Sequence, residues 1–464
     1  MSEKLLMRAE VPVELTWDIS LIYENEDALW ADVKKMDQLV SQMEAYKGKL
    51  MSAQAICDCL KAEEEYLILG DHLMNYTELA VEVDYYNNHN MELSNKVAAT
   101  LAGYKSRLSF LESEIVQASE EVLKEAIAMA GGMANYLKEI LRGKPHQLAP
   151  EAERVLAAYS DVLDLPYDIY NQAKLADMKF DPFVVDGKEY PLGYSLFEDD
   201  YEYLDDTAVR RAAFDAFSAK LAEYENVTAA AYNTCVRKEK IDADLRGFDS
   251  VFDYLLFSHH VSREMYDRQI DLIMEYLAPH MQKYAKLIQK IHGLDKMTIA
   301  DLKISIDPDY CPKVSIAQAK DLLKKGLAIL GDDYVEMIEE AFDKRWIDFA
   351  GNQGKCTGGF CSSPYKKDSF ILLSWNERMS DVMTLAHELG HAGHFRMCQR
   401  EQSIADTDVS MYFVEAPSTM NELIFANYLL KTNDDPRFRR WVLSAMISNT
   451  YYHNFVTHLL EAAH

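Results

Sequence analysis

The residues with the clearest chemical potential lie between Leu385 and Phe395, in the run L-A-H-E-L-G-H-A-G-H-F. His387 and His391 are four residues apart, so on a helix both imidazoles lie on one face and can bind one metal ion. Glu388 lies one step round that helix, where it can reach a water on the ion but is poorly placed to be a ligand. The pattern predicts a zinc site with Glu388 as general base toward water.

The bare H-E-x-x-H pattern also arises by chance, and the alternative is a pair of structural histidines on an amphipathic helix. The surrounding residues favour the catalytic interpretation. Gly390 and Gly393 each lower helix stability by about 1 kcal/mol relative to alanine, which is unexpected in a helix shaped for stability alone. Two glycines would instead suit the close approach of another backbone. Ser380 is expected to be the N-cap of the helix, with Asp381 in its first turn.

An apolar run before this helix, S-F-I-L-L-S-W from Ser369 to Trp375, predicts a short strand. A strand beside a metal-binding helix can hold an extended peptide through backbone hydrogen bonds. We therefore expect Phe370, Leu372 and Ser374 to contact a peptide substrate.

A glycine-rich segment between Gly351 and Ser363 leads into that strand. Gly358 and Gly359 would allow the backbone of a ligand to come close. An ordinary surface turn explains the same composition equally well. The segment is not a phosphate loop, because its lysine does not follow the required glycine spacing.

A catalytic zinc ion needs a third protein ligand and an open position for water. His394 follows the second histidine by three residues and lies on roughly the same side of the helix. Glu415 and Glu422 are seven residues apart and share one helix face. One of these carboxylates could bind the metal while the other accepts the N–H of a ligating histidine. Spacing alone leaves the choice among the three open.

The paired motifs H-E-L-G-H-A-G-H and F-V-E-A-P-S resemble the thimet oligopeptidase family of zinc metallopeptidases, and more closely its oligoendopeptidase F branch. The likeness extends along essentially the whole chain. It includes R-A-E-V-P-x-E-L-T-W-D-I-S-x-I-Y near the start, L-R-G-K-P-H-x-L from Leu141, R-W-I-D from Arg345, and G-K-C-T-G-G-F before the predicted strand.

The resemblance implies one Zn²⁺ ion held by His387, His391 and Glu415, with Glu388 as general base. It makes His394 a residue that lines the site and Glu422 a partner of a ligating histidine. It also implies a mainly α fold, a helical two-lobed ellipsoid with a deep substrate cleft and a small β-sheet beside the zinc helix. Such a cleft admits short unstructured peptides.

One departure from the family concerns the end of the chain. The family uses a histidine and tyrosines well after the zinc site to stabilise the oxyanion, and the sequence ends at His464 before such a motif. Four residues near the end do not match that motif: Tyr451, Tyr452, His453 and His458. We therefore expect the C-terminal part of the catalytic domain to be missing. Losing one oxyanion donor costs about 10²–10³ in rate, so weak activity is expected.

Composition limits the partners and the compartment. The 464 residues are 49% hydrophobic, which is globular, and carry a formal net charge of −28. Such an acidic chain is not expected to bind nucleic acid or an anionic membrane. No signal peptide or run of about 18 apolar residues is apparent, and the seven scattered cysteines are expected to be free thiols. We therefore expect a cytoplasmic protein, of unknown oligomeric state.

The chain is expected to be helical with few interruptions. Apolar periodicity predicts helices through most of residues 1–142, which we expect to form a helical N-terminal lobe before a zinc peptidase catalytic domain at 143–464. The dipeptide Asp186-Gly187 between apolar runs predicts a hairpin. A second short strand is expected at Ile304–Ile306.

The function expected from these features is a zinc-dependent endopeptidase that hydrolyses internal bonds of short oligopeptides. An exopeptidase would use the same zinc site but needs a group that captures a free terminus, and the sequence shows none. The alternative of a different class is a peptide-binding protein with an incomplete or inactive zinc site.

Overall fold

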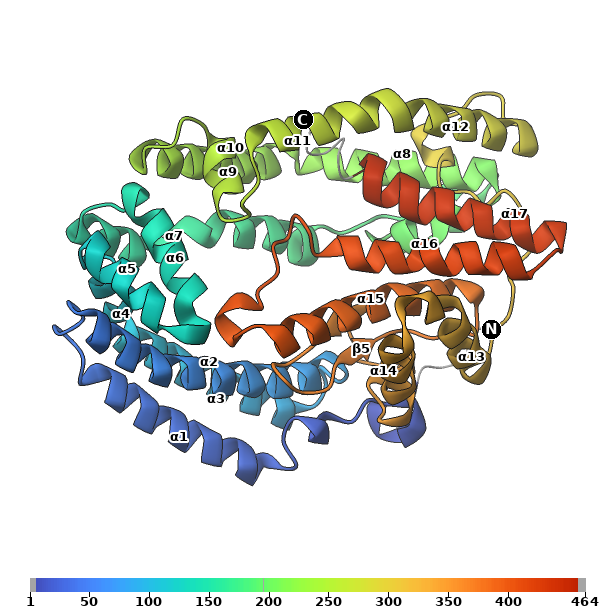
Figure 1. The fold of residues 1–464 in the computed structure, drawn as a ribbon. Coiled ribbons are helices and arrows are strands. Elements are labelled where there is room, and N and C mark those ends of the chain that lie inside the picture. Colours follow the sequence, from blue (N-terminus) through green and yellow to red (C-terminus); the bar gives the residue numbers. More distant parts are fainter. Residues whose placement is uncertain (1–5, 195, 458–464) are drawn as a thin grey trace. The chain divides into compact units, whose positions relative to one another are not determined.

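The computed structural model describes residues 6–194 and 196–457, and these residues are mainly helical with two small sheets (Figure 1). The chain divides into two compact units. The first unit combines Met1–Pro145 with Pro312–Thr432, and the second combines His146–Cys311 with Asn433–His464. The prediction of a mainly α fold with a small sheet beside the zinc helix is confirmed.

The first unit contains all the residues of the predicted zinc site. Its helices and strands, in chain order, are α1 (Glu26–Glu44), α2 (Ala53–Glu82), α3 (Asn88–Leu108), α4 (Phe110–Ile115), α5 (Glu120–Met129), α6 (Ala134–Gly143), α13 (Ile316–Leu327), α14 (Asp332–Asp343), β3 (Ile347–Asp348), β4 (Phe360–Ser362), β5 (Phe370–Leu372), α15 (Met379–Glu401) and α16 (Glu415–Thr432).

The second unit contains the hairpin and the remaining helices. They are α7 (Pro150–Asn171), β1 (Phe183–Val185), β2 (Lys188–Tyr190), α8 (Thr207–Glu223), α9 (Glu225–Leu245), α10 (Val251–Phe257), α11 (Arg263–Leu272), α12 (Ala278–His292) and α17 (Pro436–Ala445).

The division into units begins where the sequence suggested a boundary, because the chain passes from one unit to the other at Pro145–His146. It differs from the predicted domains in one respect. The helices before residue 146 form one unit with the zinc motifs, which the chain re-enters at Pro312. The two-domain assignment at 142/143 stays a prediction.

The N-terminal helices of the first unit pack through one apolar face each. Helices α1, α2 and α3 lie side by side (Figure 1), and α1 buries Leu29, Met36 and Val40 completely. Asn25 begins α1 and Ser52 begins α2, each by accepting a backbone N–H three residues later. Phe370 and Leu372 belong to the same core cluster, so this core reaches the sheet beside the zinc helix.

The three-stranded sheet has the order β3-β5-β4, with β3 parallel and β4 antiparallel to β5. Asp348 in β3 is fully buried and binds two cations, Arg8 at 2.5 Å and Lys355 at 2.6 Å. Its carboxylate also accepts the backbone N–H of Trp17. A buried carboxylate is tolerated only with such partners, so this cluster ties the N-terminal segment and the glycine-rich loop to the sheet.

The predicted hairpin is confirmed in the second unit. Val185 of β1 pairs with Lys188 of β2, which leaves Asp186 and Gly187 as a two-residue loop with positive φ angles of 52° and 78°. Both values fit a type I′ turn, the turn that Asp-Gly favours. The hairpin packs against an aromatic cluster around α8. The strand predicted at Ile304–Ile306 is wrong, because this segment forms no strand in the structure.

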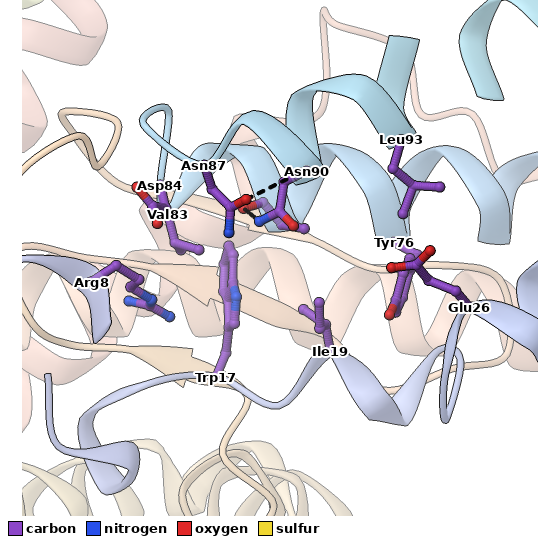
Figure 2. Close-up of a pocket in the computed structure, with 11 residues that line it drawn as sticks. Arg8, Trp17, Ile19, Glu26, Tyr76, Val83, Asp84, Asn87, Asn90 and Leu93 are labelled. Carbon is purple, nitrogen blue, oxygen red and sulfur yellow. Dashed lines mark hydrogen bonds between the residues drawn. The ribbon is translucent and has the colours of Figure 1, made fainter. Parts of the chain in front are cut away.

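A cavity of about 210 Å³ lies where the N-terminal segment meets α2 and the start of α3. Figure 2 shows Trp17 and Ile19 on one side, with Asn87 and Asn90 opposite them. Asn87 is the N-cap of α3, which gives its side chain a structural role there. None of the predicted zinc ligands lines this cavity.

A search of the helices in the described ranges finds none that combines the length and the hydropathy of a membrane-spanning segment. All seven cysteines lie in those ranges and are free thiols.

Glu63 in α2 provides a test of this fold that does not involve the zinc site. Burial and the nearby Glu112 raise its pKa from 4.5 to about 7, and its buried Oε2 has no hydrogen-bond partner in the described part of the chain. The folded state therefore keeps this proton where the unfolded state has lost it, and the free energy of unfolding falls as pH rises from about 4.5 to about 7.

We expect Glu63→Gln to remove that loss. At pH 8 the variant should be more stable than the wild type by up to about 3 kcal/mol, with little difference at pH 4. Urea denaturation at both pH values measures this, with the exposed Glu125→Gln as control. An equal shift at both pH values would contradict the assignment.

Candidate metal centre

Helices α15 and α16 approach each other so closely that side chains are excluded at two positions of α15. A Cβ at Gly390 would lie 2.5 Å from the Cα of Ser418 in α16, and one at Gly393 would lie 2.4 Å from the ring of Tyr334. The expectation that these glycines admit another backbone is confirmed at Gly390. Gly393 makes room for the aromatic ring of Tyr334 and not for another backbone.

The start of α15 differs from the prediction by two residues. The helix begins at Met379 with Arg378 as N-cap, so the assignment of Ser380 as N-cap is wrong. Asp381 is in the first turn as predicted, and its carboxylate accepts the backbone N–H groups of Asn376 and Arg378. Because the Asp381 carboxylate bonds to the backbone of Arg378, the N-cap of the helix lies at Arg378, upstream of Ser380.

Three of the candidate ligands converge at one point. The Nε2 atoms of His387 and His391 lie 3.1 Å and 3.4 Å from Oε2 of Glu415, and the three ligand atoms lie within 4.8 Å of one another. A tetrahedral zinc site with bonds of about 2.0–2.1 Å separates neighbouring ligand atoms by about 3.3 Å. Two nitrogens and one carboxylate oxygen are also a typical catalytic zinc set. The residues therefore fit a zinc ion.

Glu422 lies on the other side of the first histidine. Its Oε1 is 2.6 Å from Nδ1 of His387, so a proton on Nδ1 leaves Nε2 free to face Glu415. Burial favours the neutral imidazole, but hydrogen bonds to Glu415 and Glu422 raise the pKa of His387 to about 10. The same contacts with both histidines lower the pKa of Glu415, whose carboxylate also accepts the Ser418 hydroxyl at 2.8 Å.

Glu388 is buried beside these residues without joining them. Its Oε2 has no hydrogen-bond partner among the described residues, and burial raises the pKa of its carboxyl group. A Cβ at Gly359 would lie 3.5 Å from Oε1 of Glu388, so the backbone just before β4 passes directly against this carboxylate. A carboxyl group with a raised pKa and one free oxygen is suited to exchange a proton with a bound water.

His394 does not join the cluster of ligand atoms that contains His387 and His391. Its ring stacks on Phe395 and meets Phe413 edge-on, and burial lowers its pKa. Of the three candidates for the third ligand, the geometry favours Glu415. The roles given to the predicted site residues stay proposals.

The predicted position of the peptide needs correction. Residues Phe370–Leu372 form β5, the central strand, and both of its edges are already hydrogen-bonded to β3 and β4. Phe370 and Leu372 are also completely buried, so they have no surface to offer a substrate. Ser374 follows the strand and is exposed. In the described part of the chain, the outer strand nearest Glu388 is β4, directly after Gly358 and Gly359.

Sequence reasoning missed the residues that hold the two helices together. Tyr334 in α14 donates its hydroxyl to the carbonyl of Leu389, and Asn421 in α16 donates to Tyr334 and to the carbonyl of Ala386. Among the supporting residues of the site, only Ser418 could have been suspected from the sequence, because it follows the candidate ligand Glu415 by three residues. Tyr451 and Tyr452 lie in the second unit, whereas the His453 side chain and His458 lie outside the described residues.

Comparison with known proteins agrees with this geometry. The model of peptidase family M3 matches residues 201–457, which is more than half of the chain and includes the ligand cluster. The chain belongs to peptidase family M3. A second family model, oligopeptidase F, matches residues 114–180. The expectation of a metallopeptidase by family is therefore confirmed.

Curated relatives match nearly the whole of this family M3 chain. Oligopeptidase PepF of Bacillus subtilis is 28% identical over 446 residues, which cover 95% of this chain. Group B oligopeptidase PepB of Streptococcus agalactiae is 26% identical, covering 94% of this chain and 73% of its own length. The chain spans 66% of the Bacillus protein, just under two thirds of its length.

Solved structures share the fold. Oligoendopeptidase-F from Enterococcus faecium aligns with a TM-score of 0.66 at 19% identity, covering 94% of this chain and 74% of that one. A structure from Chlamydophila abortus aligns with a TM-score of 0.86 at 20% identity, covering 99% and 78%. At these identities the likeness establishes the fold.

The close approach at Gly390 predicts a severe effect of one methyl group. Gly390→Ala should lower the free energy of unfolding by about 1–3 kcal/mol, because the added Cβ meets backbone atoms of α16 that cannot rotate away. It should also weaken zinc binding by separating Glu415 from the histidines. Chemical denaturation and competition with a zinc chelator measure the two effects.

The matched control is Gly103→Ala in α3, where a Cβ would meet nothing within 4 Å. This change should stabilise the protein by about 0.5–1 kcal/mol, because alanine is the better helix former. Equal behaviour of the two variants would refute the packing argument.

Glu422 provides a test of the histidine partner. Glu422→Ala should weaken zinc binding by about 10–100-fold, since it removes the acceptor that orients His387. Chelator competition measures this, and the exposed Glu336→Ala serves as control. Unchanged zinc affinity in Glu422→Ala would show that the hydrogen bond does not support the ligand.

Proposed function

We propose that this chain is a zinc-dependent endopeptidase that hydrolyses internal peptide bonds of short oligopeptides. The observation that carries the proposal is the convergence of the ligand atoms of His387, His391 and Glu415 within 4.8 Å of one another, with Glu388 buried beside them. Membership of family M3 and relatives named as oligopeptidases support it.

Each group has a distinct role in the proposed reaction. Zn²⁺, when bound by the three ligands, polarises the scissile carbonyl and acidifies water at the site. Glu388 takes the proton from the attacking water and delivers it to the leaving amine. Glu422 fixes the tautomer of His387, and Ser418 fixes the orientation of Glu415 through its hydroxyl.

The peptide is proposed to extend along β4. The described strands leave one edge of β4 without a partner, because β5 occupies only the other edge. At Gly359, in the segment that leads into β4, an added Cβ would lie 3.5 Å from Oε1 of Glu388, so this backbone lies close to the carboxylate. Main-chain hydrogen bonds to this edge would place a scissile carbonyl next to the general base.

Relatives named as oligopeptidases support peptides as substrates, and free thiols are typical of a reducing compartment. We propose short peptides as substrates and the cytoplasm as location. The net charge of −28 disfavours the polyanionic surfaces of nucleic acids and acidic membranes.

Glu388→Gln tests the mechanism. The variant should bind zinc with unchanged affinity but lose at least about 10²–10⁴ in turnover, because the amide cannot take up the proton. The measurement is cleavage of an internally quenched peptide blocked at both ends, by zinc-loaded wild type and variant. Glu336→Gln, an exposed change on α14, serves as the matched control.

The blocked termini separate the rival functions. An endopeptidase cleaves this substrate, whereas an exopeptidase cleaves only the unblocked peptide. A wild-type chain that binds zinc and peptide without cleaving either would favour the peptide-binding alternative. Turnover by Glu388→Gln at the wild-type rate would exclude the proposed role of Glu388.

A further inference from the structure

The first unit has a second pocket with a very different charge. A cavity of about 480 Å³ lies among the loop between β4 and β5, the end of α14 and the last turns of α15. Its basic lining residues are Lys344, Lys366, Lys367, Arg396 and Arg400. Its acidic lining residues are Glu340 and Asp368.

This pocket is positive in a strongly negative protein. Its charged lining residues carry a net charge of three positive units, whereas the whole chain carries −28. All five basic lining residues are exposed, and the two carboxylates of the lining offset only two of their charges. The concentration of cations in one concave place indicates a recognition role for anions.

The two acidic residues are already taken by two of the cations. Glu340 binds Arg396 at 2.5 Å and Lys344 at 3.4 Å, and Lys344 also lies 3.4 Å from Asp368. Lys366 and Arg400 bind neither of these carboxylates. The Nζ of Lys366 lies over the ring of Tyr365, and Arg400 pairs with Glu401 outside the pocket lining.

The backbone at Lys366 is fixed to the neighbouring helix, although its side chain is exposed. Lys366 has a positive φ of 55°, and its N–H donates to Oε1 of Gln399 at 3.0 Å. Gln399 in turn donates to the carbonyl of Ser363 at 2.5 Å. The loop that carries two lysines is thereby fixed to α15, the helix that carries the two arginines. Such preorganisation lowers the entropic cost of binding a ligand.

A buried donor at the same pocket lacks an acceptor. Trp346 lines the cavity and is 1% exposed, and its indole Nε1 has no hydrogen-bond partner among the described residues. Buried N–H groups are nearly always paired in folded proteins. The Arg396 guanidinium lies 5.9 Å from the centroid of the Trp346 ring, so the indole packs against one of the basic lining residues.

We propose that this pocket binds a small anion that carries a phosphate group. A doubly charged tetrahedral oxyanion accepts several hydrogen bonds at once, which suits converging lysine and arginine side chains. The cavity falls within the usual range of about 300–1,000 Å³ for small-molecule sites, so it has room for an organic ester as well as for the phosphate. The site is distinct from the zinc ligands and needs no peptidase activity.

The test is isothermal titration calorimetry of the zinc-loaded chain at an ionic strength of about 10 mM, where charges are screened weakly. One arm uses inorganic phosphate and the other a hexose phosphate. We expect one molecule bound per chain, with the tighter arm identifying free phosphate or an ester as the ligand. Lys366→Gln combined with Arg400→Gln should weaken binding by about tenfold or more, the scale of one lost charge-assisted hydrogen bond.

The control is Lys124→Gln combined with Lys138→Gln, which removes the same charge from exposed sites of the first unit. This control should bind like the wild type, and thermal melts confirm that all proteins are folded. If the pocket variant does not fold, Lys366→Gln alone replaces it. Equal affinity of the pocket variant and the wild type would overturn the proposal, and so would binding of the phosphate to the zinc ion and not in the pocket. The proposal would also be overturned if neither phosphate ligand bound, or if the control variant weakened binding as much as the pocket variant.

Discussion

The metal centre depends on the close contact between α15 and α16. The two histidines of the proposed zinc site lie on one helix and the two carboxylates on the other, so the geometry of the site is the geometry of this helix pair. Gly390 brings the backbones together at Ser418, and Tyr334 and Asn421 hold the contact with hydrogen bonds to carbonyls of α15. His387 is consequently held from both sides, by Glu415 at Nε2 and Glu422 at Nδ1.

A second constraint positions β4, the strand proposed to bind the peptide. The fully buried Asp348 joins Arg8 of the N-terminal segment to Lys355 of the glycine-rich loop. Lys355 also donates to the carbonyls of Ala350 and Leu373, so its ammonium group links the loop with the strands on either side of it. The loop thus enters β4 at a fixed place, next to Glu388. Three motifs far apart in the sequence meet in this one cluster.

The sequence predicted what depends on short-range spacing. Histidines four residues apart had to share a helix face, and Asp-Gly between apolar runs had to form a tight turn. The third ligand could not be chosen by spacing, because His394, Glu415 and Glu422 all satisfied it and only the packing of α16 on α15 separates them. The peptide strand was misplaced for the same reason. An apolar run shows that a strand is buried, but pairing on both edges of β5 is a property of the assembled sheet.

The electrostatics of the site support the proposed role of Glu388 as a base beside a bound cation. Burial raises the pKa of its carboxyl group; His387 and His391 act against this shift, and Glu415 and Glu422 add to it more weakly. A divalent cation held by the neighbouring ligands acts in the opposite direction, because an adjacent positive charge favours the ionised carboxylate. The charge of Glu388 is thereby coupled to occupation of the ligand cluster. The same carboxyl group in an exposed position would keep its ordinary pKa and would be a weaker acceptor for the proton of water.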